Sequence, residues 1–216
     1  MRTLGPFSVP RVFLLASRDE LLDGVRRRLA DEEGTLFKDA PLRVALCYPS
    51  PYHVGMSSLG YQAVYRELHA LPGVTAERVF LPDDVEAWKQ ARLEPVSVET
   101  LRRLSEFDVL AFSVAYELEI IGIFELLESA GFSAFREQRD ARAPLVVMGG
   151  PLTFSNPDPL EPFTDVLVQG EADDLIAPLM ESVAALRDKR AVLEALATRP
   201  GFRVPGLSAE STRGFV

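Results

Sequence analysis

Two apolar runs that end in glycine are the part of this sequence best suited to bind a ligand. Each run is too short for a free helix and is typical of a buried parallel strand. Strands of this kind deliver their following loops to one edge of an open α/β sheet, where ligands bind, and glycine lets the backbone approach a ligand closely. The loops consist of Gly149, Gly150 and Pro151 after residues 145–148, and of Gly170 and Glu171 after residues 165–169.

Other kinds of catalytic or binding site find little support in the residue types. No G-x-x-x-x-G-K-[ST] phosphate loop is present, and no G-x-G-x-x-G follows the first predicted strand. A predicted helix separates His53 from His69, and the single cysteine, Cys47, lies in an apolar strand-like run, so we expect no metal site. No serine sits in a G-x-S-x-G elbow. We therefore predict no catalytic residue in this chain alone.

Composition limits the classes of partner. The 216 residues are 47% hydrophobic and 25% charged, which is enough for one substantial core. A formal net charge of -9 disfavours nucleic acid and anionic membranes, because binding to phosphates draws on a positive field. We find no signal peptide and no membrane span, and we expect a cytoplasmic protein.

Strand-like and helix-like segments alternate along the central part of the chain. This alternation predicts right-handed crossovers and a doubly wound α/β fold, flavodoxin-like or Rossmann-like, with a parallel five-stranded sheet in the order 2-1-3-4-5. A more polar helical pattern at 83–104 is interrupted by Pro95. The predicted strands are 43–48, 74–81, 109–113 and the two glycine-ended runs, and the predicted helices are 57–70, 119–129 and 173–186.

The same patterns predict three regions. Residues 1–40 form an N-terminal arm with one helix to about Ala30, since Ser17 and Glu20 have capping-box spacing. Residues 41–187 form the α/β domain. Residues 188–216 contain a short helical pattern followed by several prolines and glycines, which indicates a linker.

Several motifs, taken together in this order and spacing, resemble those of one protein family. The resemblance covers roughly residues 42–186 and is to the N-terminal B12-binding-like domain of cobalamin-dependent radical S-adenosylmethionine (SAM) proteins. The motifs are PYHVGMSSLG at 51–60, ERVFLP at 77–82, FSVAYEL at 112–118, GGP at 149–151, NPDPL at 156–160 and GE at 170–171.

The resemblance implies a cobalamin-binding-domain fold and a bound cobalamin. The D-x-H-x-x-G signature that supplies a histidine to cobalt is absent, so no ligation by a histidine of that motif is expected. Such proteins hold an iron-sulfur cluster on a C-x-x-x-C-x-x-C motif and use it to cleave SAM. This chain has one cysteine, so the resemblance places the cluster and SAM in a radical SAM domain, in the same polypeptide or in a partner.

The resemblance also assigns site residues by their position in the motifs. Tyr52, Val54 and Met56 would contact the corrin face, within a loop that also contains His53, Gly55 and Ser57. Ser113 and Tyr116 would hydrogen-bond the corrin amides or the nucleotide tail. The tail crevice would be lined by Gly149, Gly150 and Pro151 and closed by Gly170 and Glu171.

Each assignment has a structural alternative. The three apolar loop residues can pack over helix ends, His53 can be a solvated loop residue, and the glycine pair can form a tight turn. Glu171 can serve a helix N-terminus, and Glu117 and Glu119 can be solvated acids at a helix start. The alternative function is a Rossmann-like interaction or nucleotide-responsive scaffold that binds no cobalamin. The oligomeric state stays open.

Overall fold

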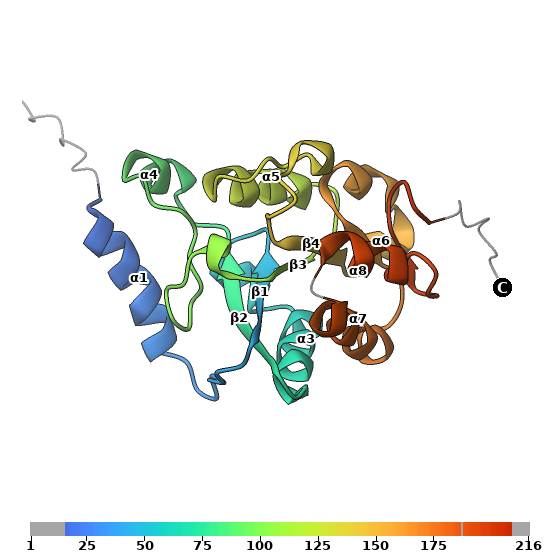
Figure 1. The fold of residues 1–216 in the computed structure, drawn as a ribbon. Helices are drawn as coiled ribbons and strands as arrows, with labels where there is room; N and C mark the ends of the chain where they lie inside the picture. The colour runs from blue at the N-terminus through green and yellow to red at the C-terminus, as the bar shows by residue number, and fades with distance from the viewer. Residues whose placement is uncertain (1–15, 187, 209–216) are drawn as a thin grey trace, which may run out of the picture.

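Strands and helices alternate along most of the chain, as the spacing of its apolar residues predicts (Figure 1). The computed structural model describes residues 16–186 and 188–208. The strands are β1 (Leu42–Tyr48), β2 (Val74–Phe80), β3 (Val109–Ser113), β4 (Leu145–Gly149), β5 (Val166–Val168) and β6 (Phe202–Arg203). The α-helices are α1 (Arg18–Ala30), α2 (Tyr52–Gly55), α3 (Leu59–Ala70), α4 (Val85–Gln90), α5 (Glu119–Ser129), α6 (Pro151–Ser155), α7 (Ala172–Leu186) and α8 (Lys189–Leu196). The short 3-10 helices are η1 (Leu104–Glu106), η2 (Arg136–Gln138) and η3 (Asp158–Phe163).

The sheet has the strand order β2-β1-β3-β4-β5-β6. The first five strands are parallel, which confirms the predicted order 2-1-3-4-5. A sixth strand that the sequence did not predict, β6, runs antiparallel to β5, with Leu167 opposite Arg203. The order reverses between β1 and β3, so the loops after these two strands flank the topological switch point.

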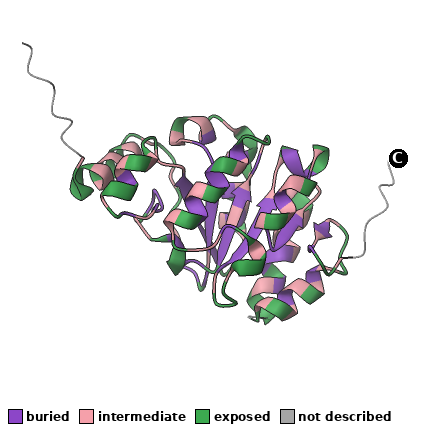
Figure 2. Ribbon diagram, turned by 90° about the horizontal axis from the view of Figure 1, so that it is seen from above, coloured by how far each residue is buried: buried purple, intermediate pink, exposed green. Residues whose placement is uncertain are grey.

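Helices cover both faces of the sheet, which makes the fold a doubly wound α/β domain. In Figure 1, α5 lies above the sheet and α3 and α7 lie below it. Successive residues of β1 divide between two cores: Val44 and Leu46 face α3 and α7, whereas Ala45 and Cys47 face α5. Buried residues are concentrated in the strands (Figure 2).

The described part of the N-terminal arm, residues 16–40, packs on the sheet. Helix α1 begins with the predicted capping box, in which the Ser17 hydroxyl accepts from the Glu20 backbone N–H and the Glu20 carboxylate accepts from the Ser17 backbone N–H. Val25 of α1 is buried in the core on the α3 side of the sheet. The arm is therefore a part of the packed structure.

The segment after β2 covers the outer edge of that strand. The predicted helical pattern at 83–104 is helical only in α4, because the chain turns after Gln90 and Pro95 prevents a further helix. Beyond it, the Val98 N–H donates to the Arg78 carbonyl over 2.8 Å, and the Arg78 N–H donates to the Glu99 carboxylate over 2.7 Å. These bonds satisfy backbone groups that an edge strand would otherwise leave exposed.

The segment from residue 188 to residue 204 differs from the linker that its composition predicts. It forms α8 and β6, and four of its apolar residues are buried. They are Val192, Leu196, Phe202 and Val204. Prolines and glycines here make turns into and out of a short strand, and the apolar stripe of α8 has a core to pack on. Within the described ranges, no helix is long and apolar enough to cross a bilayer.

Candidate functional site

The carboxyl-terminal ends of β1, β3, β4 and β5 deliver most of the predicted site residues to one edge of the sheet. Residues 51–57 follow β1, Tyr116 follows β3, Pro151 follows β4, and Gly170 and Glu171 follow β5. The parallel arrangement of these strands thus brings together four segments that are distant in the sequence. We call this side of the sheet the carboxyl edge.

The loop after β1, residues 51–57, contains the one-turn helix α2 and is called the α2 loop below. Its apolar side chains point inward, since Tyr52, Val54 and Met56 are all partly buried against the core on the α3 side. The Tyr52 ring meets Phe80 edge to face, with ring centroids 5.1 Å apart. Gly55 is buried, and a Cβ atom there would lie 2.5 Å from the Phe80 ring. Close packing over the sheet therefore accounts for these four residues.

The polar residues of the α2 loop face outward. His53 and Ser57 are exposed, and the Ser57 hydroxyl donates to the His53 carbonyl over 2.7 Å. The His53 ring thus lies at the surface of the carboxyl edge. Among the described residues, no group of three or more His, Cys, Asp or Glu side chains is placed to hold a metal ion.

Gly150 has a conformation that only glycine adopts readily, with φ +103° and ψ -178°. A Cβ atom on it would lie 2.7 Å from the Val114 carbonyl oxygen and 2.9 Å from the Val114 nitrogen. Only a residue without a side chain can therefore pack this closely against the end of β3. Gly149 is different, since a Cβ there would make an ordinary contact of 3.6 Å with Val168.

The ends of β3 and β4 are joined by backbone hydrogen bonds around this turn. Ser113 is half-buried and pairs in register with Gly149, and the Val114 N–H donates to the Gly149 carbonyl over 2.8 Å. Pro151 is exposed at the first position of α6, where its lack of an N–H costs nothing. This junction is rigid and exposes little side-chain surface except at Pro151.

The loop after β5 also combines packing with exposure. Gly170 is half-buried, and a Cβ atom there would lie 2.7 Å from the end of the Leu175 side chain in α7. Glu171 is exposed just before α7, whose first turn carries Asp173 and Asp174. These carboxylates are stabilised by the unpaired N–H groups of the helix start.

A buried carboxylate at the switch point was not predicted. Glu119, the first residue of α5, is only 2% exposed, so the alternative of a solvated acid at the helix start does not apply to it. Its carboxylate accepts from the Ala115 N–H over 2.6 Å and from the Ser50 hydroxyl over 3.2 Å. Glu119 thereby ties the loop after β1 to the loop after β3. Glu117, in contrast, is exposed as expected.

Helix α5 lies directly against the loop after β1. A Cβ atom on Gly122 would fall 2.0 Å from the Pro49 carbonyl oxygen, so only glycine permits this contact. Burial, followed by the charge of Glu119, raises the pKa of Tyr48 at the end of β1. Helix α5 and the loop after β1 therefore fill the switch point at Pro49. A ligand would bind on the outer side of these segments.

Large apolar side chains are exposed around this closed switch point. They follow the ends of three different strands, at the start of α3, before and in the first turn of α5, and in α6. They make the carboxyl edge a candidate surface for a ligand or a partner. The exposed fractions are 81% for Leu59, 45% for Tyr116, 75% for Leu118, 67% for Ile121 and 59% for Phe154.

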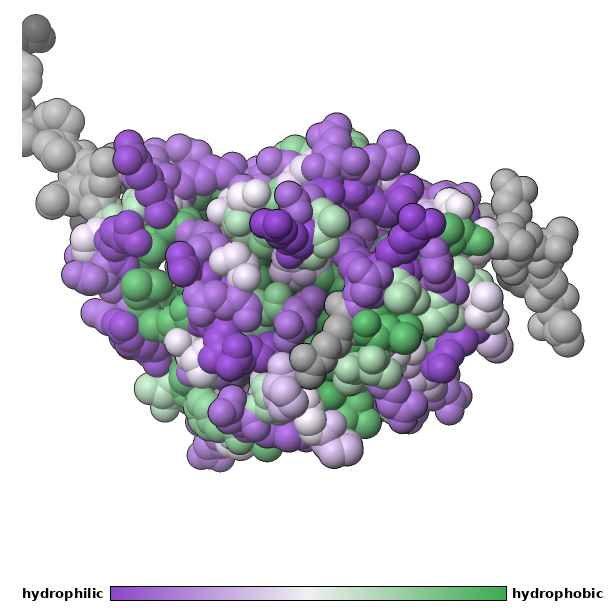
Figure 3. Space-filling view, in the orientation of Figure 1, coloured by the Kyte–Doolittle hydropathy of each residue, from purple (hydrophilic) through white to green (hydrophobic). Residues whose placement is uncertain are grey.

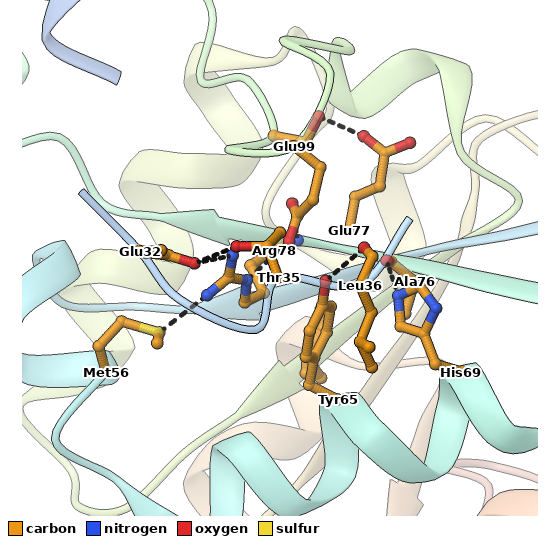
Figure 4. Close-up of polar contacts among 12 residues, drawn as sticks. Glu32, Thr35, Leu36, Met56, Tyr65, His69, Ala76, Glu77, Arg78 and Glu99 are labelled. Carbon is orange, nitrogen blue, oxygen red and sulfur yellow. Dashed lines mark hydrogen bonds and ion pairs between the residues drawn. The ribbon is translucent and has the colours of Figure 1, made fainter. Parts of the chain in front are cut away.

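A second cluster missed from the sequence joins the arm, β2 and the α2 loop (Figure 4). Its centre is Arg78, whose side chain is 3% exposed. Arg78 donates from Nε to Glu99 over 2.6 Å and from Nη2 to Glu32 of the arm over 2.7 Å. The guanidinium carbon lies 4.8 Å from the centre of the Tyr65 ring. The only hint in the sequence was a charged pair, Glu77 and Arg78, inside an apolar strand.

Arg78 and Glu32 favour each other's ionised forms, whereas burial raises the pKa of Glu99 in spite of the charge of Arg78. Burial acts to lower the pKa of Arg78, but the Glu99 and Glu32 carboxylates outweigh it and raise that pKa. Burial acts to raise the pKa of Glu32, but hydrogen bonds from Arg78 and Tyr52 lower it overall. Burial and the hydrogen bond to Glu32 raise the pKa of Tyr52 to about 12, so its phenol stays protonated at neutral pH.

A hollow of about 940 Å³ lies at the opposite edge of the sheet, where the strands begin. The residues that line it include Leu42, Val74 and Leu145 at the starts of three strands, and Met180 of α7. None of the predicted site residues lines this hollow. The face shown in Figure 3 is mostly hydrophilic, with a group of hydrophobic residues over α7.

A comparison with protein families identifies the family of this chain. A family model described as "Radical SAM proteins, N-terminal" matches residues 60–205, which is more than half of the chain. The chain belongs to this family. The matched range begins after the α2 loop and includes the ends of β3, β4 and β5 as well as α8 and β6. Among curated proteins, none matches the chain significantly.

Among solved structures, the chain is similar to the radical S-adenosylmethionine methyltransferase TsrM from Kitasatospora setae, determined with its tryptophan substrate and a SAM analogue. The two are 17% identical, with a TM-score of 0.37, and the alignment covers 74% of this chain. It covers 28% of the TsrM chain, so this chain spans little more than a quarter of its neighbour.

Proposed function

We propose that this chain is the cobalamin-binding module of a radical SAM enzyme and contains no catalytic centre of its own. The observation that carries the proposal is the group of exposed apolar side chains at the carboxyl edge, in a chain of the radical SAM N-terminal family. A doubly wound sheet binds ligands at this edge. The exposed apolar side chains and the usual place of ligands on such sheets both support this edge as the site.

The residues at this edge fit a corrin ring in their apolar character. A corrin face needs a broad apolar surface, and Leu59 of α3, Tyr116 and Leu118 before α5, and Phe154 of α6 would supply it. Tyr52, Val54 and Met56, assigned to this role by the resemblance, are partly buried beneath the α2 loop. They would therefore support the cofactor surface and contact the corrin only with their exposed atoms.

Other exposed residues lie at the same edge of the sheet. His53 and Ser57 of the α2 loop, and the Tyr116 hydroxyl after β3, are exposed where corrin amides would lie. Pro151 and Glu171 are exposed after β4 and β5, toward the far end of the site, where the nucleotide tail would extend. Ser113, Gly149, Gly150 and Gly170 would shape the site through their close packing. No histidine of the D-x-H-x-x-G type is available as a cobalt ligand.

Cobalamin bound here would supply a cobalt-carbon or one-electron chemistry that no side chain of this chain can provide. The iron-sulfur cluster and SAM would be held by a radical SAM domain, in the same polypeptide or as a partner. The role of this chain's residues is then to hold the corrin and leave its upper face open to that domain. The net charge of -9 agrees with a small-molecule and protein partner and argues against nucleic acid.

The closed switch point favours a second candidate function. The glycines at this edge allow close backbone packing and do not open a crevice. Gly122 packs against Pro49, and Gly150 packs against Val114. A scaffold without cobalamin, whose apolar carboxyl edge contacts a protein partner directly, would show the same packing. The two functions differ in whether the edge binds a corrinoid when the chain is alone.

Hydrogen exchange with and without hydroxocobalamin tests the proposed location. Protection of 51–57, 113–118 and 150–155, with no change around the hollow at the opposite edge, is expected. Leu118→Asp should weaken binding by about tenfold or more, because it places a charge against an apolar ring. Phe37→Asp alters an equally exposed aromatic on the arm and should leave affinity unchanged. Protection at the hollow, or equal affinities for both variants, would contradict the assignment.

A further inference from the structure

The α2 loop cannot hold its own conformation. Helix α2 has only four residues, and its N-cap, Pro51, makes no side-chain capping bond. A single helical turn is unstable in isolation, because nucleation fixes several residues for one hydrogen bond. Its position must therefore come from contacts with the rest of the chain.

The N-terminal arm supplies several of these contacts through one carboxylate. The Tyr52 hydroxyl donates to Glu32 Oε1 over 2.5 Å. Arg78 donates to Glu32 Oε2, and its Nη1 lies 3.2 Å from the Met56 sulfur (Figure 4). Both ends of the α2 loop are thus tied to Glu32, one directly and one through Arg78. Thr35, also in the arm, donates to Glu32 over 2.8 Å and fixes its orientation.

The arm adds a further contact, and Arg78 is itself fixed. The Arg28 guanidinium of α1 lies 5.4 Å from the centre of the Tyr52 ring. Arg78 cannot move freely, because Glu99 holds its Nε and the Tyr65 ring covers its face. The connection from arm to loop therefore runs through side chains with few alternative positions.

We infer that Glu32 of the arm, together with Arg78, positions the α2 loop for binding and thereby sets the affinity for cobalamin. Glu32 and Arg78 are positioning residues, since neither is exposed at the carboxyl edge. This inference rests on the proposed function and extends it to Glu32 of the arm, with Thr35 and Arg28 as its supports. The bonds to Glu32 and Arg78 add to the packing of the loop on Phe80 and keep its apolar underside and polar outer side in place.

The test combines Glu32→Gln, Tyr52→Phe and their double variant, with Glu33→Gln as the control, because Glu33 is an exposed neighbour in the arm. Amide exchange in 51–57 of the cofactor-free protein is measured first. Glu32→Gln should accelerate it about tenfold, as expected for loss of one hydrogen bond to a charged group. Exchange in β1, β3 and β4 should rise by much less than exchange in 51–57, which separates positioning of the loop from the general loss of stability that follows when one partner of a buried ion pair is removed.

Hydroxocobalamin affinity is measured next on the same proteins. Glu32→Gln should weaken binding about tenfold, and the double variant should be no weaker than the weaker single variant, because both changes break one connection. Additive effects would show that Tyr52 acts by direct contact alone and would overturn the inference. Unchanged loop exchange and affinity in Glu32→Gln would overturn it as well. A wild-type protein that binds no cobalamin would overturn the proposed function together with this inference.

Discussion

Substitution of Gly150 by alanine should destabilise the domain far more than the same change at Gly149. The φ and ψ of Gly150, +103° and -178°, lie in a region that is essentially restricted to glycine and costs other residues about 1–3 kcal/mol. The new Cβ would also approach the Val114 carbonyl oxygen at 2.7 Å, and backbone atoms cannot move aside as a flexible side chain can. Together these effects predict a loss of about 2–4 kcal/mol in the free energy of unfolding.

Gly149→Ala provides the matched control. Its Cβ would meet Val168 at 3.6 Å, an ordinary contact, and its backbone is that of a strand. We expect a change within about 1 kcal/mol, the usual size for a tolerated substitution. Urea unfolding of both variants, followed by circular dichroism, gives the two free energies directly. A domain is stable by only about 5–15 kcal/mol, so the predicted loss at Gly150 is readily measured.

The two variants also show whether Gly150 serves close packing or an open ligand crevice. If the missing side chain of Gly150 only opened a ligand crevice, both variants would unfold at the same urea concentration and differ only in cobalamin affinity. Equal stability of the two variants, within about 0.5 kcal/mol, would therefore refute the packing explanation.

Three further predictions concern other parts of the chain. Burial and the neighbouring Asp173 raise the pKa of Glu67 from 4.5 to about 7, so the folded protein holds an extra proton and loses stability as pH rises across that range. Glu67→Gln should therefore raise the free energy of unfolding at pH 8 by about 1 kcal/mol, after allowance for solvent screening. At pH 4 the free energy of unfolding should stay unchanged. The absence of a gain at pH 8 would contradict this prediction. Burial raises the pKa of the Cys47 thiol and keeps reagents away from it. Iodoacetamide should therefore label Cys47 in urea but not in the native protein. Labelling of the native protein would show that β1 opens. A chain that ends at residue 187 should lose about 6 kcal/mol of stability, because four buried apolar side chains, each contributing about 1.5–3 kcal/mol, would be missing. An unchanged urea midpoint would support a linker.

The sequence predicted the central fold because its periodicity and its packing agree. Residues 109–113 and 119–129 were predicted with the bounds that the structure has, since a buried strand and an amphipathic helix leave strong patterns. β6 was missed because a two-residue strand has no periodicity of its own and depends on β5 as a partner. The helical pattern at 83–104 failed after Gln90, where edge-strand coverage outweighs helix propensity.

Site residues were harder to predict because their roles depend on tertiary contacts. A glutamate at a helix start is usually solvated, and Glu119 is buried only because Gly122 lets α5 lie on Pro49. The partners of Arg78 lie 21 and 46 residues away, in irregular segments without any pattern. Tyr52 and Met56 were assigned to the corrin face from the motif, whereas packing turns much of both side chains inward.

The central claim is that the carboxyl edge of this chain binds cobalamin. Titration of the purified chain with hydroxocobalamin and methylcobalamin, read by visible absorbance after gel filtration removes free cofactor, tests it most directly. We predict retention of one equivalent of corrinoid, with a base-off spectrum, by the wild type and by Phe37→Asp but not by Leu118→Asp. A well-folded wild-type protein that emerges colourless, both alone and with its radical SAM domain, would contradict the claim and leave the scaffold function.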